Sequence, residues 1–259
     1  MRGQRGGGAV AGLCVATVSL GAWIAVAQAE FFQVGNLILR VDGGIKPTKL
    51  PKKDRVPVAL KIETTIKTED GSVPPILDRF VLDFDREGAI DSKGLPRCDS
   101  RKLQNTTSRQ ALNQCRKALV GEGVASAVVD FPDQDPFVAE GRLLAFNGPP
   151  RGGNPVVILH VLADVPLPTT FVIPAATSEA PGKRYGIRIT TSIPPIAGGN
   201  GAFRSFDLTI DRTWRHKGEL HGFANARCPI GSLLARGKFD FRDGSAASGS
   251  IVRTCTPKG

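Results

Sequence analysis

The segment Val56-Pro-Val-Ala-Leu-Lys-Ile-Glu-Thr-Thr-Ile-Lys67 indicates the fold class of this protein. Its large apolar side chains, such as Ile62 and Ile66, share one parity, and charged side chains such as Lys61 occupy the other. This alternation is typical of a β-strand with one buried and one solvated face. Antiparallel sheets often keep a face in water, whereas parallel sheets covered by helices produce continuous apolar runs. The segment therefore predicts an antiparallel sheet.

The same alternation recurs in three later segments, around Leu82, Leu208 and Phe239. The run Val156–Ala163 is apolar at both parities, which predicts a central strand covered on both faces. We expect about a dozen strands in all, because turn residues separate many short apolar runs. The further strands are expected at residues 37–41, 124–131, 137–146, 169–176, 185–193, 219–227 and 250–255.

Only residues 107–119 have the pattern of a helix. Ser108 can cap its start, apolar residues from Ala111 to Leu119 recur at helical spacing, and Gly121 follows as a stop signal. The sequence therefore predicts an all-β fold, an antiparallel two-sheet sandwich or jelly-roll-like domain with one short helix.

Residues 1–29 have the layout of a secretory signal peptide. Arg2 and Arg5 precede a long uncharged stretch that ends in the small-residue pattern Ala27-Gln28-Ala29. Cleavage there would leave residues 30–259 as a single secreted β-sandwich domain, with two smaller sandwich units as the alternative. Because about 20 apolar residues can span a bilayer, retention of the segment as an anchor stays open. We expect a secreted or cell-surface protein that has no membrane contact after cleavage.

The chain is basic, with a formal net charge of +10, and loss of the signal peptide would leave about +8. Outside a cell, such a charge attracts anionic cell-envelope polymers. No basic cluster is interleaved with aromatic residues, so no specific nucleic-acid partner is expected. The predicted anion-binding residues are the basic residues that turns would expose, Lys52, Lys53, Lys183, Arg184, Arg215 and Lys217.

Four cysteines remain after signal cleavage, an even number that suits an oxidising compartment. Of the three connectivities, we favour Cys98 with Cys115 and Cys228 with Cys255, because each pair would close a local unit of the chain. A zinc site is the competing interpretation, although no pair has the usual short ligand spacing.

No cofactor is expected, but the run from Asp83 to Asp91 is a candidate calcium site. Its acidic residues Asp83, Asp85, Glu87 and Asp91 occupy ligand positions of an EF-hand-type loop. The bidentate Glu at position 12 is missing, because Gly94 stands there, and no helix pattern flanks the run. We therefore favour the simpler interpretation, a strand whose wet face carries Asp83 and Asp85 and which ends in a turn at Glu87-Gly88.

The histidines offer few catalytic candidates. If Lys217-Gly218 form a two-residue hairpin turn, His216 faces Glu219 and Trp214 faces His221, a group that could hold zinc or a general base. His160, on the doubly apolar run, is more simply a hydrogen-bonded core residue. We find no nucleophile elbow, zinc-protease, phosphate-loop or dinucleotide motif. A pair of glycosidase carboxylates has no sequence signature, but aromatic residues for sugar stacking are scarce.

These observations favour a non-enzymatic protein with a binding or structural role in the cell envelope, whose ligand is unknown. The alternative is a secreted hydrolase that uses carboxylates and His221. Several segments also carry a resemblance: Val41–Lys53, Val56–Leu60, Leu82–Gly88, Gly94–Cys98, Phe146–Gly148, Ile193–Gly199, Phe206–Thr209, Cys228 and the ending from Cys255 to Gly259. They resemble a family of uncharacterised secreted proteins of actinobacteria. The resemblance implies export and a disulfide-linked β-rich domain but no activity.

Overall fold

The protein is a mostly antiparallel β-structure with one α-helix in the part of the chain that is described, residues 30–164 and 167–259 of a computed structural model. The predicted fold class is therefore confirmed. The signal-peptide prediction, with its Ala27-Gln28-Ala29 pattern, lies outside the described residues. One large sheet holds β1 (Glu30–Val34), β2 (Leu37–Lys46), β5 (Ala59–Thr68), β6 (Leu77–Asp85), β8 (Leu119–Val129), β9 (Phe137–Asn147), β10 (Val156–Ala163), β11 (Thr169–Glu179), β12 (Tyr185–Ser192), β13 (Gly201–Ile210), β17 (Ser232–Phe241) and β18 (Ala246–Thr254).

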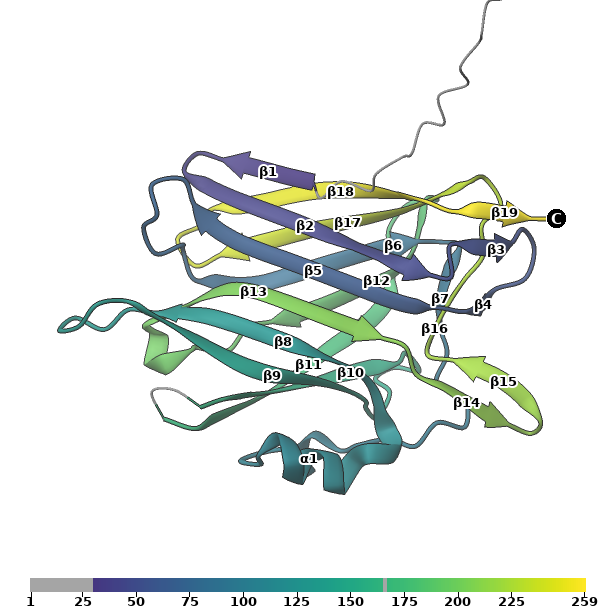
Figure 1. The fold of residues 1–259 in the computed structure, drawn as a ribbon, viewed down its shortest axis with the longest axis horizontal. Coiled ribbons are helices and arrows are strands. Elements are labelled where there is room, and N and C mark those ends of the chain that lie inside the picture. Colours follow the sequence, from purple (N-terminus) through teal and green to yellow (C-terminus); the bar gives the residue numbers. More distant parts are fainter. Residues whose placement is uncertain (1–29, 165–166) are drawn as a thin grey trace, which may run out of the picture.

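These strands form one continuous sheet that folds back on itself into two layers (Figure 1). Its order is β1-β2-β5-β13-β8-β9-β10-β11-β12-β6-β17-β18. The two edge strands, β1 and β18, lie close to each other. The ring of Phe32 on β1 lies directly over Gly249 on β18, where a side chain would not fit. Arg253 of β18 also reaches β2, where its guanidinium binds Asp42 at 2.7 Å. The two expected layers are thus halves of a single, nearly closed sheet.

Aromatic side chains fill the centre between the two layers. Phe80 on β6 stacks against Phe206 on β13 with ring centroids 5.8 Å apart, and Phe239 and Phe203 extend this group. All four side chains are buried. This aromatic group is the middle of the core, and the two ends of the interior are filled less completely.

The doubly apolar strand β10 is covered on its outer face by the chain between Cys98 and Leu119. That excursion carries α1 (Ser108–Cys115) between two short 3-10 helices, Ser100–Lys102 and Arg116–Ala118. Thr107, rather than Ser108, caps the α-helix in a reciprocal capping box with Gln110. The helix is shorter than predicted, because the backbone tightens into a 3-10 turn at Arg116.

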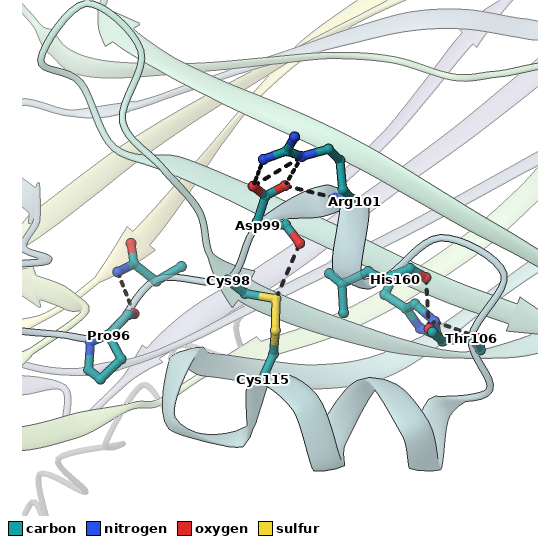
Figure 2. The surroundings of a disulfide bond; sticks show 9 residues. Pro96, Cys98, Asp99, Arg101, Thr106, Cys115 and His160 are labelled. Atoms are coloured by element: carbon teal, nitrogen blue, oxygen red, sulfur yellow. Dashed lines mark hydrogen bonds and ion pairs between the residues drawn. A yellow bond between two sulfur atoms is a disulfide. The ribbon is translucent and has the colours of Figure 1, made fainter.

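The disulfide between Cys98 and Cys115 closes this excursion (Figure 2). Beneath it, His160 of β10 is fully buried, and its Nε2 lies 3.0 Å from the carbonyl oxygen of Thr106 and 3.1 Å from that residue's hydroxyl oxygen. Burial lowers the pKa of His160. The expectation of a hydrogen-bonded core histidine is confirmed.

Short strands gather at one end of the large sheet, where Figure 1 shows them on the right. β3 (Lys49–Pro51) pairs with β19 (Thr256–Lys258), β16 (Ala224–Ala226) lies between β4 (Val56–Pro57) and β7 (Gly88–Ile90), and β14 (Thr213–His216) pairs with β15 (Glu219–Gly222). The second disulfide, Cys228 to Cys255, ties this end together, so both predicted pairings are confirmed. None of the described helices is long and apolar enough to cross a membrane.

Candidate functional site

The acidic run that suggested calcium is instead bound by arginines from neighbouring strands. Asp83 lies on the outer face of β6 and is only 2% exposed. Arg188 of β12 binds it from one side at 2.7 and 2.9 Å, and Arg236 of β17 binds it from the other side at 2.5 and 3.1 Å. The Arg236 guanidinium also stacks 4.6 Å above the Tyr185 ring. Arg188 is therefore a bidentate partner that contacts both carboxylate oxygens, whereas both hydrogen bonds of Arg236 go to Oδ2.

The electrostatics of Asp83 follow from these contacts. Burial by itself raises the pKa of a carboxyl group, because it disfavours the charged form. The hydrogen bonds and charges of Arg188 and Arg236 outweigh that effect and hold the pKa of Asp83 below its usual range. The Asp83 side chain is therefore an ionised carboxylate at neutral pH, and it forms a structural ion pair with the two arginines.

Asp85 ends β6, and Glu87 lies in the turn that follows. Asp85 accepts hydrogen bonds from the backbone N–H groups of Glu87 and Leu234 at 3.1 and 3.0 Å, and it pairs with Arg184 at 3.1 Å. Glu87 pairs with Arg227 and, at 3.2 Å, with Arg86. Burial opposes ionisation of Glu87, but the two arginines hold its pKa below the usual range. Both carboxylates are buried, so they contribute little exposed negative charge.

This turn draws two basic loops together from distant parts of the sequence. Arg86 donates its backbone N–H to the carbonyl oxygen of Arg184 at 3.1 Å and a side-chain N–H to that of Lys183 at 3.4 Å. On the other side, Arg227 bridges Glu87 to the carbonyl oxygen of Lys53, at 2.8 Å from the latter. Two of the three predicted basic pairs therefore meet at one end of the sheet.

We call this group the basic turn cluster. Arg55 completes it by donating side-chain hydrogen bonds to the carbonyl oxygens of Arg86 and Glu87 at 2.8 and 3.2 Å. The carboxylates that form ion pairs with the cluster, Asp85 and Glu87, are buried, whereas Asp54 and Glu179, near its members in sequence, are exposed. The basic turn cluster consists of Lys52, Lys53, Arg55, Arg86, Lys183, Arg184 and Arg227.

The third predicted basic pair, Arg215 and Lys217, is exposed on the β14–β15 hairpin at the same end of the molecule (Figure 1). Lys217 and Gly218 both have positive φ angles, 52° and 86°, as the predicted two-residue turn requires. Among the described residues, no hydrogen bond or ion pair links this pair to the basic turn cluster. The pair therefore stands apart from the other two.

The hairpin brings the predicted histidine group together in the expected register, with Trp214 opposite His221 and His216 opposite Glu219. His221 is stacked on Trp214 with ring centroids 5.6 Å apart. Its Nδ1 lies 2.7 Å from Asp91, while its Nε2 is buried and 4.0 Å from Glu219. An aspartate that orients a histidine is one part of a general-base arrangement.

The same contacts also hold the hairpin in place. Trp214 donates its indole N–H to the carbonyl oxygen of Lys93 at 3.0 Å, and the His216 ring lies against Gly94. Gly94 has a φ of +72°, and a Cβ atom there would meet the ring at 2.2 Å, so the close approach requires glycine. Since the reactive nitrogen of His221 is covered, the group is better suited to fastening the hairpin than to catalysis.

None of the described Asp, Glu, His and Cys residues form a group of three or more that could hold a metal ion. The four residues of the predicted calcium run contact arginines, backbone N–H groups and His221 instead of converging on one point. The four cysteines in the described part of the chain are paired as disulfides, which excludes these four as zinc ligands.

No family model, no curated protein and no solved structure matches this chain. The resemblance to secreted actinobacterial proteins therefore stays a prediction. The geometry of the chain itself carries the functional argument.

The sequence did not indicate three of the four arginines in the basic turn cluster. Arg55, Arg86 and Arg227 are single basic residues in sequence, and the acidic run beside Arg86 was interpreted as metal ligands. A usable signal was present, because buried carboxylates require partners and the chain has more arginine and lysine than acidic residues. Pairing each acidic strand position with a cross-strand arginine would have favoured ion pairs over calcium.

Proposed function

We propose that this is an exported, non-enzymatic protein that binds anionic polymers of the cell envelope through the basic turn cluster. The observation that carries the proposal is the turn at Arg86 and Glu87, which assembles basic residues from four separate segments. The acidic side chains that could neutralise them are mostly buried in ion pairs. The basic turn cluster therefore presents mainly positive charge, as polyanion binding requires.

Export is supported by two independent features. The small-residue pattern at Ala27-Gln28-Ala29 suits signal cleavage. The two disulfides are consistent with an extracellular location, because such bonds persist in oxidising compartments. A cell-envelope polymer is therefore the anionic partner that the chain would meet.

The test replaces the lysines of the cluster, because Lys52, Lys53 and Lys183 form no ion pair among the described residues and their loss should leave the fold intact. We expect K52Q/K53Q/K183Q to bind purified cell-wall material about tenfold more weakly, since exposed charge pairs contribute about 0.2–1 kcal/mol each. Binding by the wild type should also weaken between 0.1 and 1 M salt, because the Debye length falls from about 10 to about 3 Å. Pull-down and titration with inorganic polyphosphate measure both effects.

The matched control is K67Q/K102Q/K117Q, which removes the same charge from three exposed lysines outside the cluster. This variant should retain most of the wild-type affinity if position matters. If both triple variants bind equally weakly, net charge rather than the position of the lysines determines the affinity. Retention that neither salt nor the cluster variant changes would contradict the proposal.

A secreted hydrolase is the second candidate, favoured only by the Asp91–His221 pair. Its catalytic nitrogen would have to be His221 Nε2, which is buried and has no hydrogen-bond partner. Hydrolysis of a polysaccharide or ester by the purified protein, abolished in H221Q with the fold intact, would favour this candidate over the binding function.

A further inference from the structure

At the end of the molecule opposite the basic turn cluster, the interior contains an apolar cavity of about 270 Å³. It lies between the inner faces of β8, β9, β10 and β11 and the segment at residues 193–197. Phe203, from the central aromatic group, lines it on the side of the core. The cavity is therefore a separate space from the surface that we propose for polymer binding.

Small residues at inward positions create this space. Ala125, Ala127, Ala139, Gly141 and Ala163 stand where larger side chains fill the rest of the sheet interior. Gly141 also allows a close backbone approach, because a Cβ atom there would lie 2.5 Å from the carbonyl oxygen of Leu162. Protein interiors are normally close-packed, with few voids larger than a water molecule. A void of this size in an apolar environment is therefore a candidate ligand site.

The size and lining of the cavity suit a hydrocarbon group. An apolar cavity of about 150 Å³ stays dry and binds benzene, and this one is larger. Its walls include Val129, Phe171 and Ile173, and its mouth carries Leu167, which is 73% exposed, together with Phe131. An apolar path therefore leads from the surface to the interior.

The loops that flank the mouth of the cavity contain acidic residues and, as far as they are described, no basic ones. The β8–β9 loop at residues 130–136 contains three aspartates, and Asp164 follows β10 directly beside the lining residue Ala163. These loops, as far as they are described, and the segment 193–200 contain no lysine or arginine. An anionic group at the mouth would be repelled, and a cationic one attracted.

We propose that this cavity binds an aliphatic chain whose head group is uncharged or cationic. The chain would occupy the space beside Ala127, Ala139 and Phe171, and the head group would lie at the rim near Asp130 and Asp164. The apolar lining provides affinity for the chain, and the aspartates discriminate among head groups. This site is independent of the polymer-binding surface, because it lies at the opposite end and has the opposite charge.

Three probes with the same ten-carbon chain test the proposal: decanol, decyltrimethylammonium and decanoate. Each is titrated by calorimetry, the two ionic probes below their micellar concentrations and decanol below its solubility limit. We expect decanol and decyltrimethylammonium to bind with one-to-one stoichiometry and decanoate to bind at least tenfold more weakly than the ammonium probe. High salt should reduce the difference between the two charged probes, because it screens the aspartates. Decanoate binding as tightly as the ammonium probe, or no binding by any probe, would refute the proposal.

The location of the site is tested by filling it. A139F places a ring in the cavity and should weaken decyltrimethylammonium binding at least tenfold. A235L is the matched control, because Ala235 lines a second apolar cavity, of about 130 Å³, at the other end of the interior. If A139F does not fold, A163F replaces a half-buried lining residue near the mouth and serves the same purpose. Unchanged binding in the folded cavity-filling variant, or equal loss in A235L, would overturn the assignment.

Discussion

Removing the second disulfide in a C228A/C255A variant is expected to lower the free energy of unfolding by about 2–5 kcal/mol. The bond joins cysteines 27 residues apart in sequence, and both residues are buried. In the chain-entropy account, a cross-link of this length stabilises the protein by restricting the unfolded chain. Urea unfolding, followed by circular dichroism, measures the change. An unchanged unfolding midpoint at an unchanged slope would contradict the expectation.

The same bond supports the basic turn cluster. Cys228 donates its backbone N–H to the carbonyl oxygen of Pro51 at 2.8 Å, directly before Lys52 and Lys53. Thr256, beside Cys255, donates to the carbonyl oxygen of Thr48 at 2.9 Å. In the variant we therefore expect weaker polymer binding and unchanged binding of decyltrimethylammonium, because the cavity lies at the other end of the sheet. Removal of the Cys98–Cys115 bond in C98A/C115A, which leaves these contacts intact, is the matched control.

The strands were predictable because their signal is local. Alternation around Ile62 or Leu208 follows from one buried and one solvated face, and it needs no knowledge of the partner strand. The strand Val156–Ala163 was predicted with its exact bounds, because both of its faces are apolar. Its outer face is apolar because α1 covers it, whereas the outer faces of most other strands are in water. The hairpin register was also predictable, because a two-residue turn at Lys217-Gly218 fixes which residues of the two strands face each other.

Contacts between distant segments were not predictable in this way. The single, nearly closed sheet depends on Phe32 meeting Gly249 and on Arg253 meeting Asp42, which are far apart in sequence. The short strands β3, β7 and β19 have no periodic pattern, because two or three residues are too few to reveal one. The basic turn cluster likewise depends on tertiary contacts, such as that between Arg227 and Lys53, across 174 residues. The cavity has a weak local signal, since alanine and glycine at inward positions also occur in well-packed sheets.

The arrangement separates two kinds of surface along the strand direction. In an antiparallel sheet, alternate connections lie at opposite ends, so the loops after β9 and β11 lie away from the loops after β8 and β10. The first end carries the basic turn cluster, and the second carries the aspartates around the apolar cavity. Attachment of the basic end to a polyanion would leave the mouth of the cavity facing outward. The two proposals are therefore compatible in one molecule and separable by experiment.

The buried ion pair at Asp83 should be among the most sensitive positions in the chain. D83N keeps the shape of the side chain but removes its charge, which leaves Arg188 and Arg236 without their shared carboxylate. Breaking a buried ion pair costs about 3–5 kcal/mol, and we expect about 3 kcal/mol here because both guanidinium groups are partly exposed. D240N is the matched control, since Asp240 pairs with Arg79 at 2.8 Å on the same face but is more exposed. We expect it to lose at most about 1 kcal/mol.

The dependence on pH separates the charge of Asp83 from its packing. The two arginines hold the pKa of Asp83 below its usual range, so its ionised form stabilises the folded protein at pH values above the unfolded-state pKa of about 4. That contribution is lost as the pH falls through the lower pKa of the folded state, because the wild-type carboxyl then becomes neutral, as asparagine is. The difference in unfolding free energy between wild type and D83N should therefore be constant from pH 5 to 7 and narrow below about pH 4. A difference that stays constant down to the lowest pH at which the wild type folds would assign the effect to hydrogen-bond geometry rather than to charge.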